Sequence, residues 1–280
     1  MVVLTVPKYI DNSKADVISV YTTFAGNFLP VENCSLIMTN ANVIFNIDYP
    51  VYPVLHNTIN LNFNGNYTIY NPNESLNMTL VAPFSPDFKN LESTCLIKIG
   101  GTVAPFSFVE YNLYESPWEQ YLTHPYGMSS RRKFIVINAT FPENDSIDIE
   151  FSFNAYIANP SSRDELIIFY DVGTSRAWNG TITEYVEFRV YGTLPDSYLK
   201  YNPDWFNYNC TVSNIENGKS YAWEWENEFI IINWVYILYR YYYHRDILEN
   251  FIFLIAIAQL IALPIIIMVI VMRKVKRETL

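Results

Sequence analysis

Residues 147–157 read IDIEFSFNAYI, a run in which apolar and polar side chains alternate. In an extended chain, successive side chains point to opposite faces. This places Ile147, Ile149, Phe151 and Phe153 on one face, and Asp148, Glu150, Ser152 and Asn154 on the other. One apolar face and one polar face are typical of a strand in a sheet that covers a core on one side only.

Similar runs occur on both sides of this segment. TINLNF (58–63) and NYTIYN (66–71) flank Asn64-Gly65, and CLIKI (95–99) precedes Gly100-Gly101, so two hairpins are predicted. Residues 115–132 lose the alternation and gain Pro, Gly and Ser, which indicates a linker. The sequence therefore predicts an all-β chain with two consecutive β-sandwich domains, residues 1–114 and 133–246.

A single membrane span is predicted after these domains. Residues 251–272 read FIFLIAIAQLIALPIIIMVIVM without a charge, and the basic run RKVKR follows at once. A helix of this length rises about 33 Å, enough to cross a hydrocarbon core. Because basic residues favour the cytoplasmic side, we expect a transmembrane helix at 247–272, a cytoplasmic tail at 273–280, and residues 1–246 outside the cell membrane. The tyrosine-rich segment ILYRYYYHRD (237–246) is typical of the outer interface.

The first residues, MVVLTVPKYI, contain only a short apolar run, so a signal peptide is not evident. Three interpretations stay open: a truncated start, a signal already removed, or a tail-anchored chain with its bulk in the cytosol. The last would place RKVKR outside, against the charge rule.

Composition excludes several classes of function. The net charge is −10, which disfavours binding to nucleic acid. With 9 Gly and 3 His, and without a recognisable nucleotide-binding, hydrolase or metalloprotease motif, the sequence predicts a protein that is not an enzyme and that holds no metal or cofactor.

Eight asparagines stand in the N-x-S/T acceptor pattern for N-linked glycans, and all precede the predicted span. They are Asn33, Asn66, Asn73, Asn77, Asn138, Asn144, Asn179 and Asn209. We predict that these are glycosylation sites, against the alternative that they belong to asparagine-rich strands and turns. Turn positions such as Asn73 and Asn179 are expected to be exposed, whereas Asn138, within a strand, could face the core.

The chain has three cysteines. Cys34 and Cys95 both lie in the first predicted domain, and an oxidising exterior permits a disulfide between them. Cys210 is then left unpaired or joined to another chain.

Two further patterns have structural explanations. Glu143, Asp145, Asp148 and Glu150 could ligate calcium, but a solvated hairpin is the stronger interpretation. Trp223 and Trp225 share one face of a strand and could form a glycan platform, but core tryptophans are the stronger interpretation.

The strand-rich segments NATFPENDSIDIEFSFNAYI and TEYVEFRVYG, followed by one span and a short basic tail, resemble membrane-anchored extracytoplasmic β-sandwich surface proteins of prokaryotes. The juxtamembrane string ILYRYYYHRDILENFI is also similar to that of single-span accessory subunits of oligosaccharyltransferase, of the ribophorin type. Neither resemblance implies catalytic residues.

These observations predict a single-pass protein with a structural or interaction role at the cell surface. The expected partners are the lipid bilayer, other membrane or surface proteins, and N-linked glycans. The alternatives are a non-catalytic accessory subunit of a membrane complex such as an oligosaccharyltransferase and, third, an ectodomain hydrolase.

Overall fold

The computed structural model describes residues 20–32, 34–48, 58–112, 131–158, 165–192, 199–201, 210–240 and residue 255. The chain divides into two compact units, Met1–Arg240 and Tyr241–Leu280. The predicted span and tail belong to the second unit, where only Ile255 is described. Within the described residues, no helix combines the length and apolar character that crossing a membrane requires.

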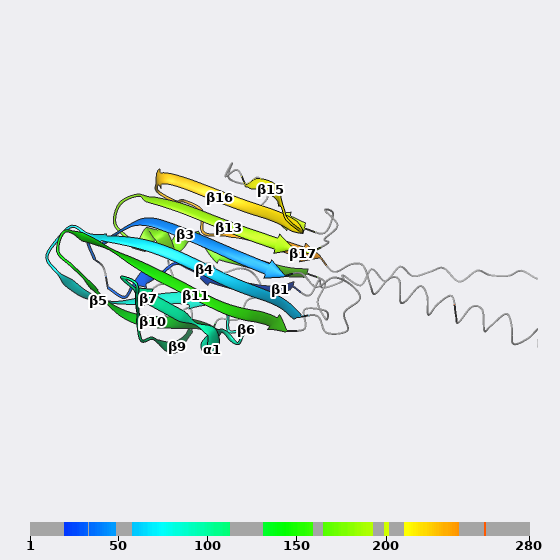
Figure 1. Ribbon diagram of the computed structural model, residues 1–280, viewed down its shortest axis with the longest axis horizontal. Helices are drawn as coiled ribbons and strands as arrows, with labels where there is room; N and C mark the ends of the chain where they lie inside the picture. Colours follow the sequence, from blue (N-terminus) through cyan, green and yellow to red (C-terminus); the bar gives the residue numbers. More distant parts are fainter. Residues whose placement is uncertain are drawn as a thin grey trace, which may run out of the picture. The chain divides into compact units, whose positions relative to one another are not determined.

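The described part of the first unit is built almost entirely of strands, which form two sheets (Figure 1). In spatial order, sheet A contains β14 (Leu199–Tyr201), β17 (Val235–Arg240), β12 (Glu165–Asp171), β1 (Val20–Gly26), β5 (Leu76–Phe84), β10 (Arg131–Phe141) and β9 (Ser107–Asn112), with β2 (Leu29–Pro30) also paired to β5. Sheet B contains β15 (Thr211–Ile215), β16 (Gly218–Glu228), β13 (Ile182–Tyr191), β3 (Ile37–Asp48), β4 (Thr58–Asn71), β11 (Asp145–Ala158), β7 (Leu96–Ile99) and β8 (Thr102–Val103), with β6 (Phe88–Lys89) paired to β11.

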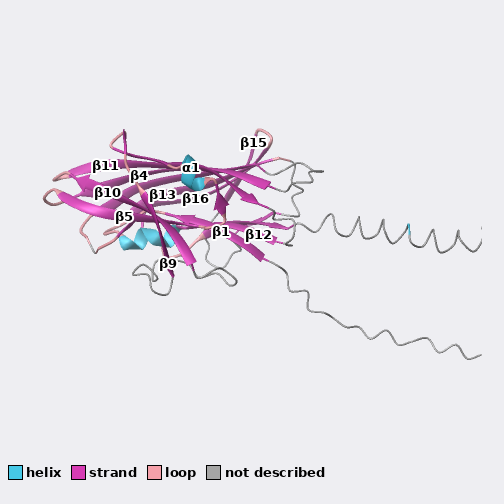
Figure 2. Ribbon diagram, turned by 90° about the horizontal axis from the view of Figure 1, so that it is seen from below, coloured by secondary structure: helices cyan, strands magenta, loops and turns pink. Residues whose placement is uncertain are grey.

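Two short helical segments complete the described part of this unit. They are α1 (Leu91–Thr94), which contacts β11, and a 3₁₀-helix (Val172–Ala177). Figure 2 shows α1 beside the strands of sheet B. The prediction of an all-β chain is therefore confirmed for the described residues.

The alternation predicted for residues 147–157 is present in β11. Ile149, Phe151, Phe153 and Ile157 are buried, whereas Asp148 and Asn154 are exposed. The strand pairs with β4 over its whole length, from Asp145 opposite Asn71 to Ala158 opposite Thr58. The apolar faces of the two sheets meet in the core, where Phe45 of sheet B lies 5.8 Å from Tyr170 of sheet A, measured between ring centroids.

The prediction of two consecutive sandwiches is wrong. Each sheet contains strands from both predicted domains: β1 pairs in parallel with β12, and β3 pairs in parallel with β13. On the other side, β5 pairs with β10 and β4 pairs with β11. The β3–β4 pair thus lies between two strands of the second half, and no boundary can be drawn near residue 115. Alternation within a strand predicts which face is buried but carries no information about which strand lies beside it.

A row of phenylalanine rings across sheet B joins the two halves of the chain. Phe188 of β13 stacks on Phe45 of β3 with centroids 4.7 Å apart, and Phe63 of β4 stacks on Phe153 of β11 at 4.9 Å. Phe45 and Phe63 meet edge to face at 5.0 Å, which completes the row. Paired aromatic rings stabilise a fold beyond the apolar area that they bury.

Of the two predicted hairpins, one is present and one is not. Gly100 and Gly101 both have positive φ and join β7 to β8, as a two-residue hairpin turn requires. Asn64-Gly65, in contrast, lies in the middle of β4, a continuous strand of 14 residues. Gly65 faces the core, and a Cβ there would lie 2.5 Å from the hydroxyl oxygen of Tyr67. The glycine therefore makes room for a buried tyrosine instead of forming a turn.

We predict that Phe45→Ala lowers the free energy of unfolding by about 3–5 kcal/mol, because it leaves a cavity in the middle of the aromatic row. The control is Phe229→Ala, since Phe229 is 69% exposed whereas Phe45 is fully buried. Chemical denaturation of both variants measures the difference. Equal losses at the two positions would contradict the placement of the row in the core.

Candidate functional site

The outer face of sheet B carries a row of amide side chains that runs across three strands. Asn46 of β3, Asn62 of β4 and Asn154 of β11 are direct neighbours in the register of the sheet. Asn46 Nδ2 donates to Asn62 Oδ1 at 3.0 Å, and Asn62 Nδ2 donates to Asn154 Oδ1 at 2.9 Å. We call these three residues the amide row. Because each amide holds the next, their orientations are fixed relative to one another.

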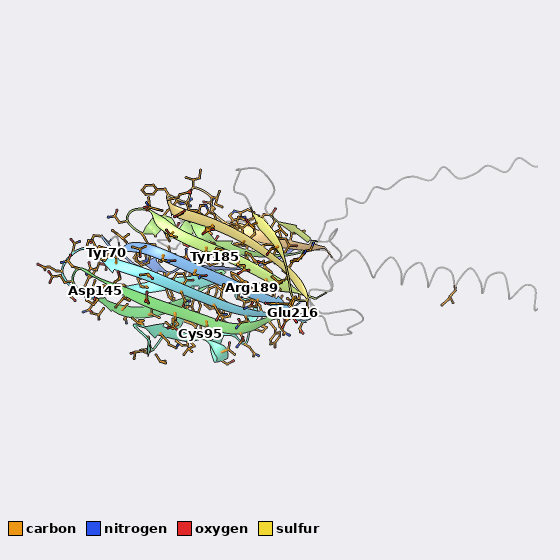
Figure 3. All side chains as sticks on the ribbon, turned by 45° about the horizontal axis from the view of Figure 1, so that its top comes forward. Tyr70, Cys95, Asp145, Tyr185, Arg189 and Glu216 are labelled. Carbon is orange, nitrogen blue, oxygen red and sulfur yellow. The ribbon has the colours of Figure 1, made fainter. Side chains whose placement is uncertain are left out.

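The residues at its two ends extend this network. The hydroxyl of Tyr191, on β13, donates to Asn46 Oδ1 at 3.3 Å. At the opposite end, the hydroxyl of Thr94, in α1, donates to the carbonyl of Asn154 at 2.5 Å. Figure 3 looks onto this face, where Tyr70 of β4 and both Tyr185 and Arg189 of β13 are labelled.

A second row lies beside the first, two residues further along the strands. Tyr191, Asp48, Asn60 and Tyr156 are register neighbours on β13, β3, β4 and β11. Among the described residues, the side chains of Asp48, Asn60 and Tyr156 have no hydrogen-bond partner. We call these four residues the open row, because three of them leave their donors and acceptors available.

All residues of the two rows except Tyr191 line a hollow of about 240 Å³. The amide row contributes Asn46, Asn62 and Asn154, and the open row contributes Asp48, Asn60 and Tyr156. Asn90, just before α1, and Thr94, at the end of α1, also line the hollow. Asp48 is the one charged residue among the described residues lining the hollow. The site therefore offers amides, hydroxyls and one carboxylate to a ligand from solvent.

A second polar cluster lies inside the sandwich and joins the two sheets. Asn27, just after β1, donates through Nδ2 to Glu184 Oε1 at 2.9 Å and accepts a hydrogen bond from the hydroxyl of Tyr170. Tyr170 in turn lies 3.4 Å from the hydroxyl of Tyr67, on β4. Glu184 is fully buried on the inner face of β13, and its Oε2 has no hydrogen-bond partner in the described part of the chain.

Burial raises the pKa of Glu184 to about 8, although the hydrogen bond from Asn27 opposes the shift. The carboxyl is therefore mostly neutral at pH 7. The residues that line the described hollows do not include Glu184, so we assign this cluster a structural role.

Six of the eight predicted glycan acceptors are described, and the side chains of all six are exposed. They are Asn66, Asn73, Asn77, Asn138, Asn144 and Asn179, whereas Asn33 and Asn209 lie outside the described residues. Asn138 thus points to solvent and not to the core. The structure does not bring the six together: they are spread over several strands and turns of both sheets.

Two of these acceptor sequences face each other across β5 and β10. Asn77 is opposite Thr140, and Thr79 is opposite Asn138. The hydroxyl of Thr140 donates to Asn77 Oδ1 at 2.6 Å, and the hydroxyl of Thr79 donates to Asn138 Oδ1 at 2.7 Å. Each asparagine is therefore bound to the threonine of the other acceptor sequence.

The predicted disulfide between Cys34 and Cys95 is not formed, because both cysteines are free thiols, as is Cys210. Cys34 precedes Ser35, whose hydroxyl accepts a hydrogen bond from the side chain of Asn73. Asn73 follows the end of β4 at which Asn71 pairs with Asp145 of β11. Cys95 precedes Leu96, which pairs with Ser152 of β11, and Ser152 lies seven residues further along β11 than Asp145. Seven residues of strand span about 23 Å, whereas a disulfide needs Cα atoms within about 7 Å. Cys95 is marked beside α1 in Figure 3.

The other patterns read from the sequence have structural roles. Trp223 and Trp225 are each 1% exposed and belong to the core, as predicted. Within the acidic cluster, Glu150 forms an ion pair with Lys98 at 2.7 Å, and Asp148 accepts a hydrogen bond from Thr68. The described residues contain no group of three or more potential metal ligands.

Sequence reasoning missed the amide row and Glu184. The signal for the amide row was present: residues 60–66 read NLNFNGN, with asparagine at every second position. Interpreting Asn64-Gly65 as a turn divided this pattern and hid it. Glu184 lies in the alternating run of β13, at a position on the apolar, buried side. A carboxylate among apolar residues on that side was the signal that could have revealed it.

Comparison with family models finds no match, and comparison with curated proteins finds none either. Solved structures do match. A "putative nutrient binding protein" from Legionella pneumophila aligns with a TM-score of 0.57 at 12% identity, covering 79% of this chain and 72% of that one. An M1 zinc metallopeptidase from Deinococcus radiodurans aligns with a TM-score of 0.35 at 8% identity, covering 73% of this chain and 42% of the peptidase. A "putative protease" from Parabacteroides distasonis aligns with a TM-score of 0.37 at 9% identity, covering 74% of this chain and 41% of the protease.

The first of these similarities shows that the two-sheet architecture occurs in another protein. At 12% identity it concerns the fold alone.

We predict that the stability of the protein falls as the pH rises from about 5 to 8. Folding raises the pKa of Glu184 from 4.5 to about 8, so the folded state binds this proton more tightly than the unfolded state. The stabilisation is complete below pH 4.5 and is lost as the pH rises through about 8, by roughly 5 kcal/mol in total. Urea unfolding at several pH values measures this slope.

Glu184→Gln should flatten the slope, because glutamine stays neutral throughout. The control is Glu226→Gln on the exposed side of β16, which should keep the slope of the unchanged protein. An identical pH profile for Glu184→Gln and the unchanged protein would contradict the assignment.

Proposed function

We propose that this chain is a membrane-anchored, extracytoplasmic glycoprotein with an interaction role at the cell surface. The observation that carries the proposal is the exposure of all six described acceptor asparagines. A glycan can be carried only by a side chain that reaches solvent, and acceptor sequences are modified in chains that leave the cytosol. Six exposed acceptors on one sandwich therefore support an extracytoplasmic location.

The sequence supplies the anchor. The uncharged run at 251–272 is long enough to span a bilayer, and RKVKR marks its cytoplasmic side. In this arrangement, residues 1–246 lie outside and residues 273–280 lie inside.

The interaction role rests on the outer face of sheet B. This face combines an amide row of fixed geometry with an open row whose polar groups are available. Fixed polar groups beside a hollow are typical of binding sites, because a ligand then loses less entropy on binding.

Protease treatment of intact cells, followed by mass spectrometry of the released peptides, tests this proposal. We expect released peptides from residues 1–246 only. We also expect a modified asparagine in at least some peptides that contain the six exposed acceptors. Lysed cells serve as the control, since they expose the tail as well. Release of the tail alone from intact cells, or unmodified asparagine at every acceptor, would refute the proposal.

Size analysis after extraction in mild detergent separates this role from that of an accessory subunit. A lone chain agrees with a surface protein that acts by itself. A stable hetero-complex with other membrane proteins would favour a subunit such as those of oligosaccharyltransferase.

A further inference from the structure

We infer that the hollow on the outer face of sheet B binds a saccharide, with the amide row and the open row as its recognition surface. This inference names a ligand class for the proposed surface role and therefore rests on it.

The two rows form a grid of polar groups. Asn46, Asn62 and Asn154 make one line, and Asp48, Asn60 and Tyr156 make the next, on the same three strands. Neighbouring strands lie about 4.8 Å apart, and side chains two residues apart along a strand are about 6.7 Å apart. These spacings allow one small ring to contact polar groups from both rows at the same time.

The hydrogen bonds give the two rows different roles in the proposed site. In the amide row each asparagine holds its neighbour, and Asn62 Oδ1 accepts from both Asn46 and Asn64. In the open row, Asp48, Asn60 and Tyr156 have no partner in the described part of the protein. The first row therefore forms a rigid floor, while the second can exchange its bonds to water for bonds to a ligand.

The lining groups favour a neutral polyhydroxylated ligand. An amide side chain donates and accepts at once, and a carboxylate accepts two hydroxyl groups, so both suit adjacent sugar hydroxyls. Tyr156 adds an aromatic ring at the end of the row. An anion would need a basic side chain, and the described lining has none; a hard divalent cation would need more than the single carboxylate of Asp48.

The size and chemistry of the site favour binding over cleavage. At about 240 Å³ the hollow is smaller than the pockets that hold drug-sized ligands, so it suits one sugar unit of a longer chain. Glycosidases use two carboxyl groups, whereas Asp48 is the one carboxylate in the described lining. Saccharide recognition without hydrolysis is the expected outcome.

Asn90 contributes a further amide to the lining of the hollow. It precedes α1 with φ 67° and ψ −4°, the left-handed region that non-glycine residues seldom adopt. Its side chain makes no hydrogen bond that caps α1. Its exposed side chain lines the hollow instead, where it adds one more amide.

The test uses the full chain in mild detergent and four immobilised oligosaccharides, each ending in glucose, galactose, mannose or N-acetylglucosamine. We expect at least one of them to bind. Asp48→Ala and Asn60→Ala should each weaken that binding about tenfold, the usual effect of losing one hydrogen bond to a ligand hydroxyl, more for the charged group. Both side chains are exposed and have no partner among the described residues, so both variants should fold.

The matched control is Asn42→Ala. Asn42 is exposed on the same strand and the same face as Asp48, but it does not line the hollow. Its substitution should leave the affinity unchanged.

Failure of all four probes to bind would overturn the inference, and so would equal binding by Asp48→Ala, Asn60→Ala and Asn42→Ala. Because this assay uses purified protein, it is independent of the side of the membrane on which the sandwich lies. A chain that binds sugars but faces the cytosol would refute the proposed location alone, and a surface chain that binds none would refute the saccharide site alone.

Discussion

The stacking of four phenylalanine rings across sheet B is the interaction on which the rest of the structure depends. Phe188, Phe45, Phe63 and Phe153 lie on four adjacent strands, and the second and third belong to the first half of the chain. Because Phe45 or Phe63 takes part in every contact of this row, removing β3 and β4 from between β13 and β11 would abolish all of these contacts. Burying these rings favours the interleaved arrangement over two separate sandwiches.

The same register determines what the opposite face presents. Each phenylalanine is adjacent in sequence to an outward-facing residue: Arg189, Asn46, Asn62 and Asn154. Since side chains alternate along a strand, aligning the rings on the inner face also aligns the amides on the outer face. A slip of one residue in β3, β4 or β11 would turn its asparagine into the core. It would break both the row of phenylalanine rings and the amide row. The stability of the core and the geometry of the proposed saccharide site therefore depend on one pairing register.

Most local features of this fold could be predicted from the sequence, apart from the turn wrongly expected at Asn64-Gly65, whereas its connectivity could not. Alternation in residues 147–157 indicated a half-buried strand, and Gly100-Gly101 indicated a hairpin, because each depends on neighbouring residues only. The parallel pairing of β1 with β12 joins residues far apart in the sequence, and no local pattern encodes it. The error about Cys34 and Cys95 has the same origin, since their assignment to one domain did not fix their positions along the strands. The exposed acceptors were predicted from a motif, whereas the hollow needed the spatial order of β3, β4 and β11 to become visible.

Amide hydrogen exchange at increasing denaturant concentrations tests the interleaved sandwich most directly. If β3 and β4 are held between β11 and β13, the slowest amides of β4 and β13 share one global unfolding reaction, and their opening free energies converge to the same value. Two consecutive domains would give two values, with β4 and β13 losing protection at different denaturant concentrations. We expect convergence, and two separate transitions would contradict the interleaved sandwich.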